Sequence, residues 1–452
     1  MSAKNRRAFE GERDEHPDRE SGMRAAILAG GRGTRIGGMF PDLPKPMIPA
    51  AGKPLLRHQI EALAAQGIRR ITLIVGYRAD VIRSYFGDGR DFGAAIDYIT
   101  EDEPLGTGGA MSLLPREKTL ILMGDVYVDM DFGRFIRFHD EHNAGVSLFA
   151  HPNSHPSDSD AVVTDGQARV TAWKSKHDER KEDLRNLANA GIYIFSASAL
   201  PSGEARKRDL DRNVIAALVP SGKVFAYRSP EYVKDMGTPE RLESVEHDVK
   251  NGVTAARNLK NKQRAVFLDR DGTINAEDGF ITNPERIRLL PGIAASIAML
   301  NSSRLPAICV TNQPVVARGE ASFEGLEAVH ARLDVLLGRE GAYLDDLLFC
   351  PHHPDRGFEG EITEYKIDCD CRKPKPGMLF RAAERYNIDL NRSYMIGDRT
   401  SDIAAGRSAG AKTIGVLTGR RLNDGKCEAK PDMTFDTLLD AVNWILAAET
   451  TI

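Results

Sequence analysis

The feature that most constrains this chain is an alternation of short apolar runs with helical segments, and it starts twice. The first series begins with the apolar run 25–29, continues with helical spacing over 54–66 and reaches a second apolar run at 71–75. The second series begins at 265–268, after a polar stretch at 247–263. Alternating strands and helices indicate a mostly parallel sheet covered on both faces. The sequence therefore predicts two α/β domains in one chain.

The same pattern predicts the domain boundaries. Residues 1–22 lack periodicity and mix five Lys or Arg with six Asp or Glu, so we expect either a disordered tail there or an upstream start before Met23. We place the first domain at 23–246, a linker at 247–263 and the second domain at 264–452. At roughly 150 residues per domain, a chain of 452 residues has room for two large domains.

Composition and charge exclude several kinds of partner. The 61 Lys and Arg nearly balance the 65 Asp and Glu, whereas a surface for nucleic acid or an anionic membrane would normally need a basic excess. No apolar run approaches the roughly 18–20 residues of a membrane span, and the polar N-terminus does not resemble a secretory signal. We therefore expect a cytoplasmic protein with small-molecule partners. Its oligomeric state stays open.

A Gly-rich turn follows the first apolar run. It reads Leu28-Ala-Gly-Gly-Arg-Gly-Thr-Arg35. Its glycines would let backbone N–H groups approach a phosphate, and Arg35 adds positive charge. The turn is not a dinucleotide fingerprint, because Ile36 stands where a third glycine would be needed, and the sequence contains no P-loop pattern. Alone, this turn is weak evidence for a nucleotide site.

Four further segments strengthen the case for a nucleotide site. Lys45 lies between two prolines, which restrict its backbone. Residues 103–110 form a second Gly-rich loop, against which a flat base could lie. Asp125 follows the apolar run 120–123, at the strand end where α/β sheets bind ligands. The motifs at 189–191 and 234–238 complete the set.

In this order, over residues 23–246, the motifs resemble the sugar-1-phosphate nucleotidylyltransferases. The resemblance implies that a sugar phosphate oxygen attacks the α-phosphorus of a nucleoside triphosphate and that pyrophosphate leaves. It also implies that Lys45 neutralises the α-phosphate and that Asp125 and Asp235 hold Mg²⁺. The implied contacts are Gly30, Gly31, Gly33, Thr34 and Arg35 for the triphosphate, Gly106, Thr107, Gly108 and Gly109 for the base, and Asn189, Gly191 and Lys176 for the sugar phosphate. One residue departs from the family pattern, since Ser175 replaces the glutamate before the lysine.

The second domain opens on a strand that carries two carboxylates. Asp269 and Asp271 are two residues apart in an extended segment, so their side chains point the same way. A later apolar run ends in Thr311, another ends in Asp398, and Lys373 lies between an arginine and a proline. We expect all of these segments to end at the ligand-binding edge of one parallel sheet.

These motifs resemble the haloacid dehalogenase phosphatases. The resemblance implies that Asp269 attacks phosphorus to form an aspartyl phosphate, while Asp271 protonates the leaving group and then activates water. Thr311 and Lys373 would bind phosphoryl oxygens. Mg²⁺ would be held by Asp269, Asp398 and the backbone carbonyl of Asp271.

A cluster of soft metal ligands lies within the second domain. Residues 350–371 contain four such ligands: Cys350, His352, Cys369 and Cys371. This set fits a tetrahedral zinc site, and four protein ligands leave no open position, so the zinc would be structural. Arg372 and Lys373 directly follow the last ligand, so bound zinc would fix their positions. His352 is preferred over His353 by resemblance alone.

The zinc spacing narrows the resemblance to the D-glycero-D-manno-heptose 1,7-bisphosphate 7-phosphatases and their relatives, the histidinol-phosphate phosphatases. The substrate contacts implied are Glu277, Asp278, Gly279, Phe280, Thr311, Asn312, Gln313, Pro314, Arg372, Lys373 and Arg399. The adjoining transferase favours heptose, because a phosphatase that leaves a sugar 1-phosphate makes the transferase's substrate. The H-x-G-H motif of the adenylyl branch is absent from the sequence. We therefore expect GTP as donor and GDP-D-glycero-α-D-manno-heptose as product.

Two alternatives stay open. One is a nucleotidylyltransferase for another sugar 1-phosphate, fused to a histidinol-phosphate-type or other small-molecule phosphatase. The other is a scaffolding protein built on inactive copies of both folds. The second is disfavoured because every motif acid is present: Asp125, Asp235, Asp269, Asp271 and Asp398.

Overall fold

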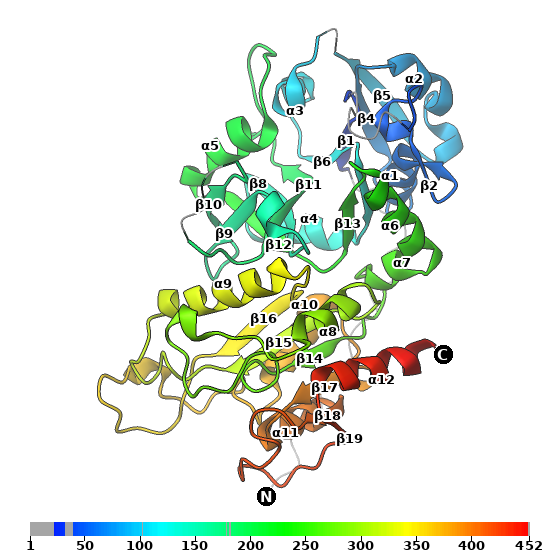
Figure 1. Cartoon of the computed structure of the whole chain (residues 1–452). Coiled ribbons are helices and arrows are strands. Elements are labelled where there is room, and N and C mark those ends of the chain that lie inside the picture. Colours follow the sequence, from blue (N-terminus) through cyan, green and yellow to red (C-terminus); the bar gives the residue numbers. More distant parts are fainter. Residues whose placement is uncertain (1–21, 32–38, 102, 178, 180–181, 451–452) are drawn as a thin grey trace, which may run out of the picture.

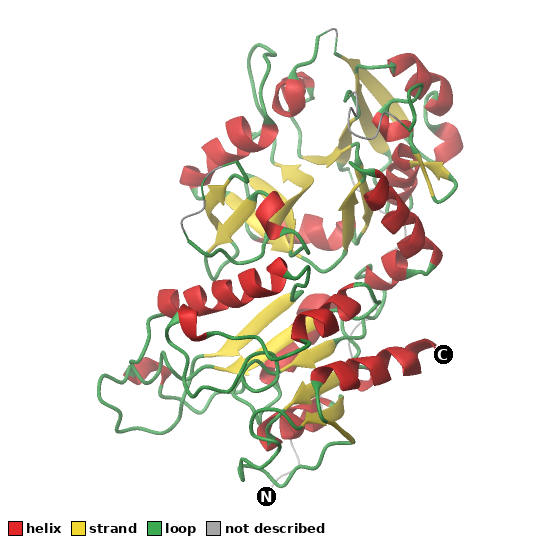
Figure 2. Ribbon diagram, viewed as in Figure 1, coloured by secondary structure: helices red, strands yellow, loops and turns green. Residues whose placement is uncertain are grey.

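The computed structural model describes residues 22–31, 39–101, 103–177, 179 and 182–450. It contains two α/β domains, one above the other in the view of Figure 1, and helices α6 (Pro239–Lys250) and α7 (Val253–Arg257) run between them along one side. The colours of Figure 2 show that each domain has its own sheet with helices around it. The expected fold class, two α/β domains, is confirmed. Of the tail expected at 1–22, residues 1–21 lie outside the described residues.

The N-terminal domain is built on a mixed sheet, which has nine strands in the described part of the chain. Its main path is β10-β9-β11-β6-β1-β4-β5, with β8 beside β11 and β12 beside β8. Strands β6, β1, β4 and β5 are parallel, whereas β11 runs antiparallel to β6. A separate ribbon pairs β7 with β13. The strand bounds are β1 (Arg24–Leu28), β4 (Arg70–Val75), β5 (Ala95–Thr100), β6 (Thr119–Met123), β7 (Val126–Asp129), β8 (Val146–His151), β9 (Ala161–Thr164), β10 (Val170–Lys174), β11 (Ala188–Phe195), β12 (Val224–Arg228) and β13 (Tyr232–Asp235), with a short pair β2 (Pro49–Ala50) and β3 (Lys53–Pro54).

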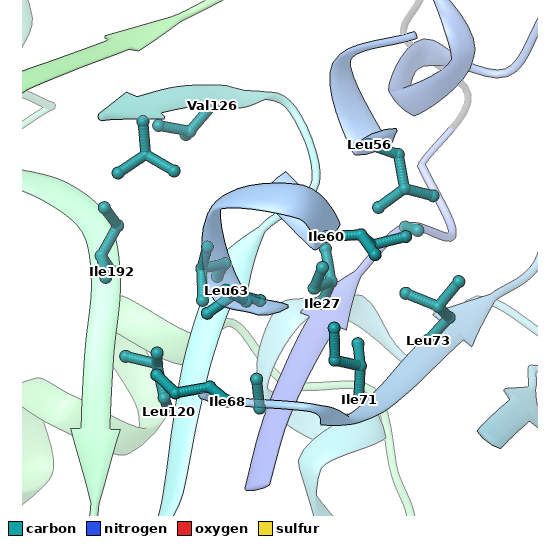
Figure 3. Packing of buried hydrophobic residues seen from close by; sticks show 14 of the residues in the cluster. Ile27, Leu56, Ile60, Leu63, Ile68, Ile71, Leu73, Leu120, Val126 and Ile192 are labelled. Carbon is teal, nitrogen blue, oxygen red and sulfur yellow. The ribbon is translucent and has the colours of Figure 1, made fainter. Parts of the chain in front are cut away.

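Helix α1 shows how this domain forms its core. Leu56, Ile60 and Leu63 recur at helical spacing, so they form one apolar stripe. This stripe packs on Ile27 and Leu73 of the parallel strands (Figure 3). The helices of the domain are α1 (Leu55–Ala64), α2 (Ala79–Phe86), α3 (Gly106–Gly109), α4 (Phe132–Glu141) and α5 (Ala216–Leu218), with a 3₁₀ turn η1 (Lys45–Met47), a 3₁₀ turn η4 (Pro156–Asp158) and a π-helix η5 (Leu210–Ile215).

The C-terminal domain is a parallel sheet with helices on both faces. Its strand order is β16-β15-β14-β17-β18-β19, and all neighbouring pairs are parallel. Along β14, Val266 and Leu268 pack in one core cluster and Phe267 in another, as alternating side chains of a strand do. The bounds are β14 (Val266–Leu268), β15 (Ala307–Asn312), β16 (Asp346–Cys350), β17 (Tyr394–Gly397), β18 (Lys412–Val416), β19 (Met433–Phe435), α8 (Ile293–Asn301), α9 (Phe323–Arg339), α10 (Gly377–Tyr386), α11 (Thr400–Ala409) and α12 (Leu438–Thr450).

The segment expected to be a linker, 247–263, is helical at 247–250 and 253–257. Helix α6 continues to Lys250 and α7 follows. The polar side chains of this segment join the two domains: an Arg257 nitrogen lies 3.1 Å from Oδ1 of Asp345, and Asn258 donates to Asp129. Polar composition here therefore reflects a docked connection rather than an extended one. Among the described helices, none combines the length and apolar character needed to cross a membrane.

Candidate active sites

Lys45 and Asp125 meet in the N-terminal domain although they are distant in sequence. Lys45 begins the turn η1, directly after Pro44, and Asp125 lies in the turn between β6 and β7. The lysine Nζ atom lies 2.6 Å from Oδ2 of Asp125. The structure therefore brings together the cation and one of the acids that the sequence singled out.

Asp235 lies beside Asp125. It ends β13, where it pairs with Val126 of β7, and Met236 N donates to the Asp125 carbonyl at 2.8 Å. Arg241 donates to Asp235 at 2.6 Å, a partner that the sequence analysis missed. The two carboxylates, one in the turn before β7 and one at the end of its partner β13, supply the oxygen ligands that Mg²⁺ prefers, so the residues present fit the expected ion. In this structure their charges are compensated by Lys45 and Arg241.

Only part of the first Gly-rich turn lies in the described chain. Gly30 and Gly31 follow β1, whereas Gly33, Thr34 and Arg35 lie outside the described residues. A Cβ atom on Gly30 would come within 2.5 Å of a Glu101 carboxylate oxygen, so glycine permits this close approach. Burial raises the pKa of the Glu101 carboxyl above its usual range. Glu101 is a second polar group at this turn that the sequence analysis missed.

The second Gly-rich segment packs against its own chain. Residues Gly106–Gly109 form α3, and a Cβ on Gly106 would come within 2.5 Å of the Arg208 carbonyl. Thr107 accepts a hydrogen bond from the Leu210 backbone at 2.9 Å. Close packing against the segment 206–210 therefore explains, by itself, why small residues are needed at these positions. Contact of Gly106, Thr107, Gly108 and Gly109 with a base stays a prediction.

Asn189 and Gly191 lie at an irregularity of β11. The pairing of β11 with β8 shifts register between Asn189 and Tyr193, and bulges of this kind re-aim side chains at functional sites. Asn189 Nδ2 donates to the Tyr193 hydroxyl at 2.7 Å and to Asp211 at 3.2 Å. The Tyr193 hydroxyl in turn donates to Asp211 at 2.6 Å. Asp211, in the π-helix η5, is therefore a carboxylate beside the predicted sugar contact, and the sequence analysis missed it.

Lys176 follows β10 and lies against the loop 152–160. Its backbone N donates to Asp160 Oδ1 at 2.8 Å, and its Nζ lies 3.6 Å from Asp158. The Ser175 hydroxyl donates to the same Asp160 oxygen at 3.4 Å. The family pattern places a carboxylate at position 175, and here Asp160 brings one next to that position from a neighbouring loop.

In the C-terminal domain, the predicted acids and lysine meet at the carboxyl edge of the sheet. The Lys373 Nζ atom lies 2.7 Å from Asp269 Oδ1 and 2.7 Å from Asp402 Oδ1. It also donates to the Val310 carbonyl of β15 at 2.7 Å. All of these groups are buried. The lysine therefore cross-links two carboxylates beneath the strand ends.

Asp271 is held by three donors in addition to its position after β14. Arg270 and Asn275 donate to it at 2.9 Å each, and Gln313 donates at 2.8 Å. Burial alone would raise the pKa of the Asp271 carboxyl, but the Arg270 charge and these hydrogen bonds outweigh burial and lower it. Asp271 is therefore ionised in this state of the protein.

A buried carboxylate cluster lies beside Asp269. Carboxylate oxygens of Asp269, Asp398 and Asp402 all lie within 4.8 Å of one another. Burial and the charges of the neighbouring acids raise the pKa of Asp269 and Asp398 above the usual range. The one lysine leaves negative charge uncompensated, so the donor set fits a divalent cation with oxygen ligands.

Asp269, Asp402 and Lys373 line a cavity of about 700 Å³. Its lining includes most of the predicted substrate contacts: Glu277, Gly279, Phe280, Thr311, Asn312, Pro314, Arg372, Lys373 and Arg399. Of the other contacts, Gln313 is buried behind the lining, and Asp278 pairs with Arg286 at 2.9 Å instead. The sequence analysis missed three lining cations: Arg318, Arg420 and Lys426.

The four expected soft ligands converge beside this cavity. Atoms of Cys350, His352, Cys369 and Cys371 lie within 4.8 Å of one another. His352 Nδ1 lies 3.3 Å from the Cys371 sulfur, whereas His353 Nδ1 accepts from the Asp355 backbone. This geometry favours His352 as the fourth ligand. Thiolates and an imidazole in this number fit zinc.

Comparisons with known proteins assign each half of the chain to a protein family. The nucleotidyl transferase family model matches residues 24–252, and the HAD-hydrolase-like model matches residues 370–441. Over 257 residues the chain is 34% identical to a mannose-1-phosphate guanylyltransferase of Mycobacterium tuberculosis, covering 55% of this chain and 70% of the relative. The chain belongs to the nucleotidyl transferase family in its first half and to the HAD-like hydrolases in its second.

Two further relatives match the second half. A D-glycero-beta-D-manno-heptose-1,7-bisphosphate 7-phosphatase of Rhodopseudomonas palustris is 42% identical, covering 33% of this chain and 81% of the relative. One of the same name from Haemophilus ducreyi is 36% identical, covering 40% of this chain and 98% of the relative. The nucleotidyl transferase and the HAD-like phosphatase are thus present together in one bifunctional enzyme, which acts on small molecules.

Proposed function

We propose that this enzyme carries out two consecutive steps on a phosphorylated heptose. The phosphatase domain removes the 7-phosphate of D-glycero-D-manno-heptose 1,7-bisphosphate. The transferase domain then transfers GMP from GTP to the remaining 1-phosphate and releases pyrophosphate. The phosphatase product is the transferase substrate, which gives the fusion a chemical reason.

The observation that carries this proposal is the surplus of cations in the phosphatase cavity. Lys373 alone would serve the phosphoryl group beside Asp269. The cavity adds five more cations: Arg318, Arg372, Arg399, Arg420 and Lys426. Glu277 pairs with two of them, Arg399 at 2.7 Å and Arg420 at 3.0 Å, which holds their guanidinium groups in place. The lining also carries carboxylates: Asp269, Asp271 and Asp402 at the reacting group, and Glu277 and Asp355 besides. Because the five cations outnumber Glu277 and Asp355, they fit a substrate that carries a second phosphate away from the reacting one.

The phosphatase reaction starts at Asp269. Its carboxylate attacks phosphorus, the sugar oxygen leaves, and an aspartyl phosphate forms. Lys373 and Thr311 bind the phosphoryl oxygens and neutralise the charge that develops on them. Mg²⁺ held by Asp269 and Asp398 would supply further positive charge, so that one anion can approach another.

Asp271 transfers protons in both halves of this reaction. Protonated, it donates to the leaving sugar oxygen, and ionised, it takes a proton from the water that hydrolyses the aspartyl phosphate. In this structure Arg270, Asn275 and Gln313 hold it in the ionised form that the second half needs. The arrival of a dianionic substrate nearby favours the protonated form, because like charges raise a carboxyl pKa.

The transferase reaction depends on charge neutralisation rather than on a protein nucleophile. The sugar 1-phosphate oxygen attacks the α-phosphorus of GTP, and pyrophosphate leaves in line. Lys45 neutralises the α-phosphate, and Asp125 and Asp235 would hold Mg²⁺ there. Asn189, Asp211 and Lys176 offer an amide, a carboxylate and an ammonium group to the sugar phosphate.

The identity of the sugar and the configuration of its anomeric carbon need a test, because the relatives are named for different sugars. We propose the α-anomer, with GDP-D-glycero-α-D-manno-heptose as product. The two phosphatase relatives are named for the β-anomer, and the transferase relative is named for mannose 1-phosphate. A second candidate function, guanylyl transfer to mannose 1-phosphate, therefore belongs in the same test.

The test gives purified enzyme each heptose 1,7-bisphosphate anomer with GTP, ATP or UTP and Mg²⁺. Mannose 1-phosphate replaces the heptose in parallel reactions. We expect phosphate release from position 7, then pyrophosphate release with GTP, and GDP-heptose by mass spectrometry. A product that still carries the 7-phosphate would contradict the order of steps. Turnover with ATP or UTP but not GTP would overturn the guanylyl assignment, and faster turnover of mannose 1-phosphate would favour the second candidate.

A further inference from the structure

The phosphatase domain contacts the transferase domain next to the transferase's sugar residues. Helix α9 of the phosphatase lies beneath the edge of the transferase sheet that contains β9 (Figure 1). A Cβ on Gly338 of α9 would come within 2.6 Å of Pro156 in the loop 152–160. A cavity of about 410 Å³ at this junction is lined by Lys176 on one side and by Val335 and Gly338 of α9 on the other.

One α9 side chain bonds directly to the transferase chain. Asp334 Oδ2 accepts from Arg185 Nε at 2.7 Å and from the Asn186 backbone N–H at 3.1 Å. Asp334 is 4% exposed and Asn186 is 3% exposed. Hydrogen bonds to an ionised group are stronger than neutral ones, and removing such an acceptor leaves buried donors without a partner. This carboxylate therefore holds Asn186 firmly.

Asn186 connects Asp334 by hydrogen bonds to the sugar side of the transferase site. Its side chain makes two hydrogen bonds with the Asn153 backbone, at 3.1 Å and 2.7 Å. Asn153 begins the loop that carries Asp160, and Asp160 accepts from Lys176 N and, through its carbonyl, from Asn189 N. Asn189 itself is only three residues after Asn186. Two of the three predicted sugar-phosphate contacts, Lys176 and Asn189, are thus connected to the helix of the other domain.

The hydrogen bonds of Asp334 lead mainly to the sugar side of the site. They reach the segments 152–160 and 185–189, whereas Lys45 lies in η1 and Gly30 follows β1. One described contact leads from the loop 152–160 toward the nucleotide side: His155 Nε2 lies 3.2 Å from an Arg241 nitrogen, and Arg241 donates to Asp235. Loosening Asp334 should therefore disturb binding of the sugar phosphate more than binding of the nucleoside triphosphate.

We infer that Asp334, a residue of the phosphatase domain, is a positioning residue for the sugar 1-phosphate in the transferase reaction. This inference rests on the proposed function, since it needs Lys176 and Asn189 to contact the sugar phosphate. The phosphatase domain then has a second task besides its own chemistry. It positions the transferase segments that contact the sugar 1-phosphate.

The test compares Asp334→Ala with a matched control in the full-length enzyme. Glu327→Ala is that control, because Glu327 pairs with the same Arg185 at 2.9 Å and makes no hydrogen bond to Asn186. We expect Asp334→Ala to raise KM for the sugar 1-phosphate about ten-fold, because small misplacements of a binding group weaken productive binding strongly. KM for GTP and phosphatase turnover should stay within about two-fold, and Glu327→Ala should change KM for the sugar 1-phosphate by less than about two-fold.

Two further measurements separate positioning from general damage. Asp334→Asn keeps an acceptor oxygen for the Asn186 N–H, so its KM should lie between those of wild type and Asp334→Ala. Hydrogen–deuterium exchange of segments 152–160 and 185–189 should rise in Asp334→Ala and not in Glu327→Ala. Retained phosphatase activity shows that the domain carrying Asp334 is folded, because its active site lies in the same domain.

The outcomes distinguish this inference from the proposed function. Wild-type enzyme without turnover on any sugar 1-phosphate would reject the proposed function and this inference with it. Normal wild-type turnover with an unchanged sugar 1-phosphate KM in Asp334→Ala would reject only the inference. An equal rise in KM for GTP, or unchanged hydrogen exchange, would also overturn it.

Discussion

The Nζ atom of Lys45 lies 2.6 Å from Oδ2 of Asp125, although 80 residues separate the two in sequence. The ion pair joins η1 to the turn that follows the central strand β6. Asp125 is an expected Mg²⁺ ligand, so a bound metal ion would compete for its charge. The lysine would then be free to turn toward the α-phosphate.

The first prediction concerns Lys45. Lys45→Gln should lower the rate of pyrophosphate release about 10²- to 10³-fold, because the charge on the α-phosphate then lacks its cation in the transition state. Phosphatase turnover should not change. Lys53→Gln is the control, since Lys53 forms an ion pair with Glu61 in the same domain and lies outside the expected site. Equal losses in both variants would contradict a specific role for Lys45.

The second prediction separates the two activities. Asp269→Asn should reduce phosphate release at least about a thousand-fold, because an amide cannot act as the nucleophile. Pyrophosphate release from heptose 1-phosphate and GTP should continue. Asp125→Ala should show the reverse pattern. Loss of both activities from either change, in protein that keeps its far-UV circular dichroism, would show that the sites are not independent.

The third prediction concerns the cluster of Cys350, His352, Cys369 and Cys371. Cys369→Ser should lower bound zinc and reduce phosphatase turnover, because Lys373 follows the cluster closely and depends on it for position. Transferase turnover should stay within about two-fold of wild type. Cys427→Ser should keep full zinc, because Cys427 is not in the cluster. Elemental analysis decides the matter, and zinc-free wild-type protein with full phosphatase activity would contradict it.

The fourth prediction concerns the pH dependence of sugar phosphate binding. Burial raises the pKa of Asp211 to about 6, against the opposing hydrogen bond from Tyr193. Asp211 is ionised above this pH and can then accept hydrogen bonds from Tyr193, Asn189 and the sugar. We expect kcat/KM for the sugar 1-phosphate to rise as pH increases through about 6 and then to level off.

Asp211→Asn provides the control for this profile. The substrate phosphate itself titrates near pH 6, and that contribution stays in both proteins. The part of the profile that belongs to Asp211 should vanish in the variant. Identical profiles for wild type and Asp211→Asn would show that the carboxylate does not act in binding.

The fifth prediction concerns the stability contributed by Glu231. Burial raises its pKa to about 7, although backbone N–H groups of Asp131 and Leu259 donate to it. Because the folded state holds this proton more tightly than the unfolded state, the contribution is complete below about pH 4.5 and is lost as pH rises to about 7. Glu231→Gln avoids that loss. The free energy of unfolding of the variant, relative to that of wild type, should therefore rise by about 2 kcal/mol between pH 5 and pH 8. Denaturant unfolding of both proteins across this pH range measures the difference, and a constant difference would contradict the assignment.

The sequence predicted the fold class and most of the phosphatase site because those signals are local. Asp269 and Asp271 are two residues apart just after β14, and Cys369 and Cys371 are separated by one residue. In an extended segment, residues two apart point their side chains to the same side, so this spacing alone brings the two groups together. Apolar runs such as 25–29 likewise mark buried strands without any knowledge of their neighbours.

The residues that the sequence analysis missed come from distant segments without a motif of their own. Arg241 reaches Asp235 from α6, and Asp211 reaches Asn189 from η5. Arg318 enters the phosphatase cavity from the turn after β15. A lone arginine or aspartate is normally a surface residue, so nothing in its sequence context distinguishes it.

Sequence by itself thus determined the two folds, the positions of the strand-end acids and the cluster of three cysteines and a histidine, because periodicity and short-range spacing carry that information. Only the tertiary structure decided which side chains support them. The hydrogen bond from the Asn186 backbone N–H to Asp334 joins two residues that are 148 positions apart in sequence and belong to different domains. Such a contact depends on how two completed domains pack, and no local pattern of residues encodes that arrangement.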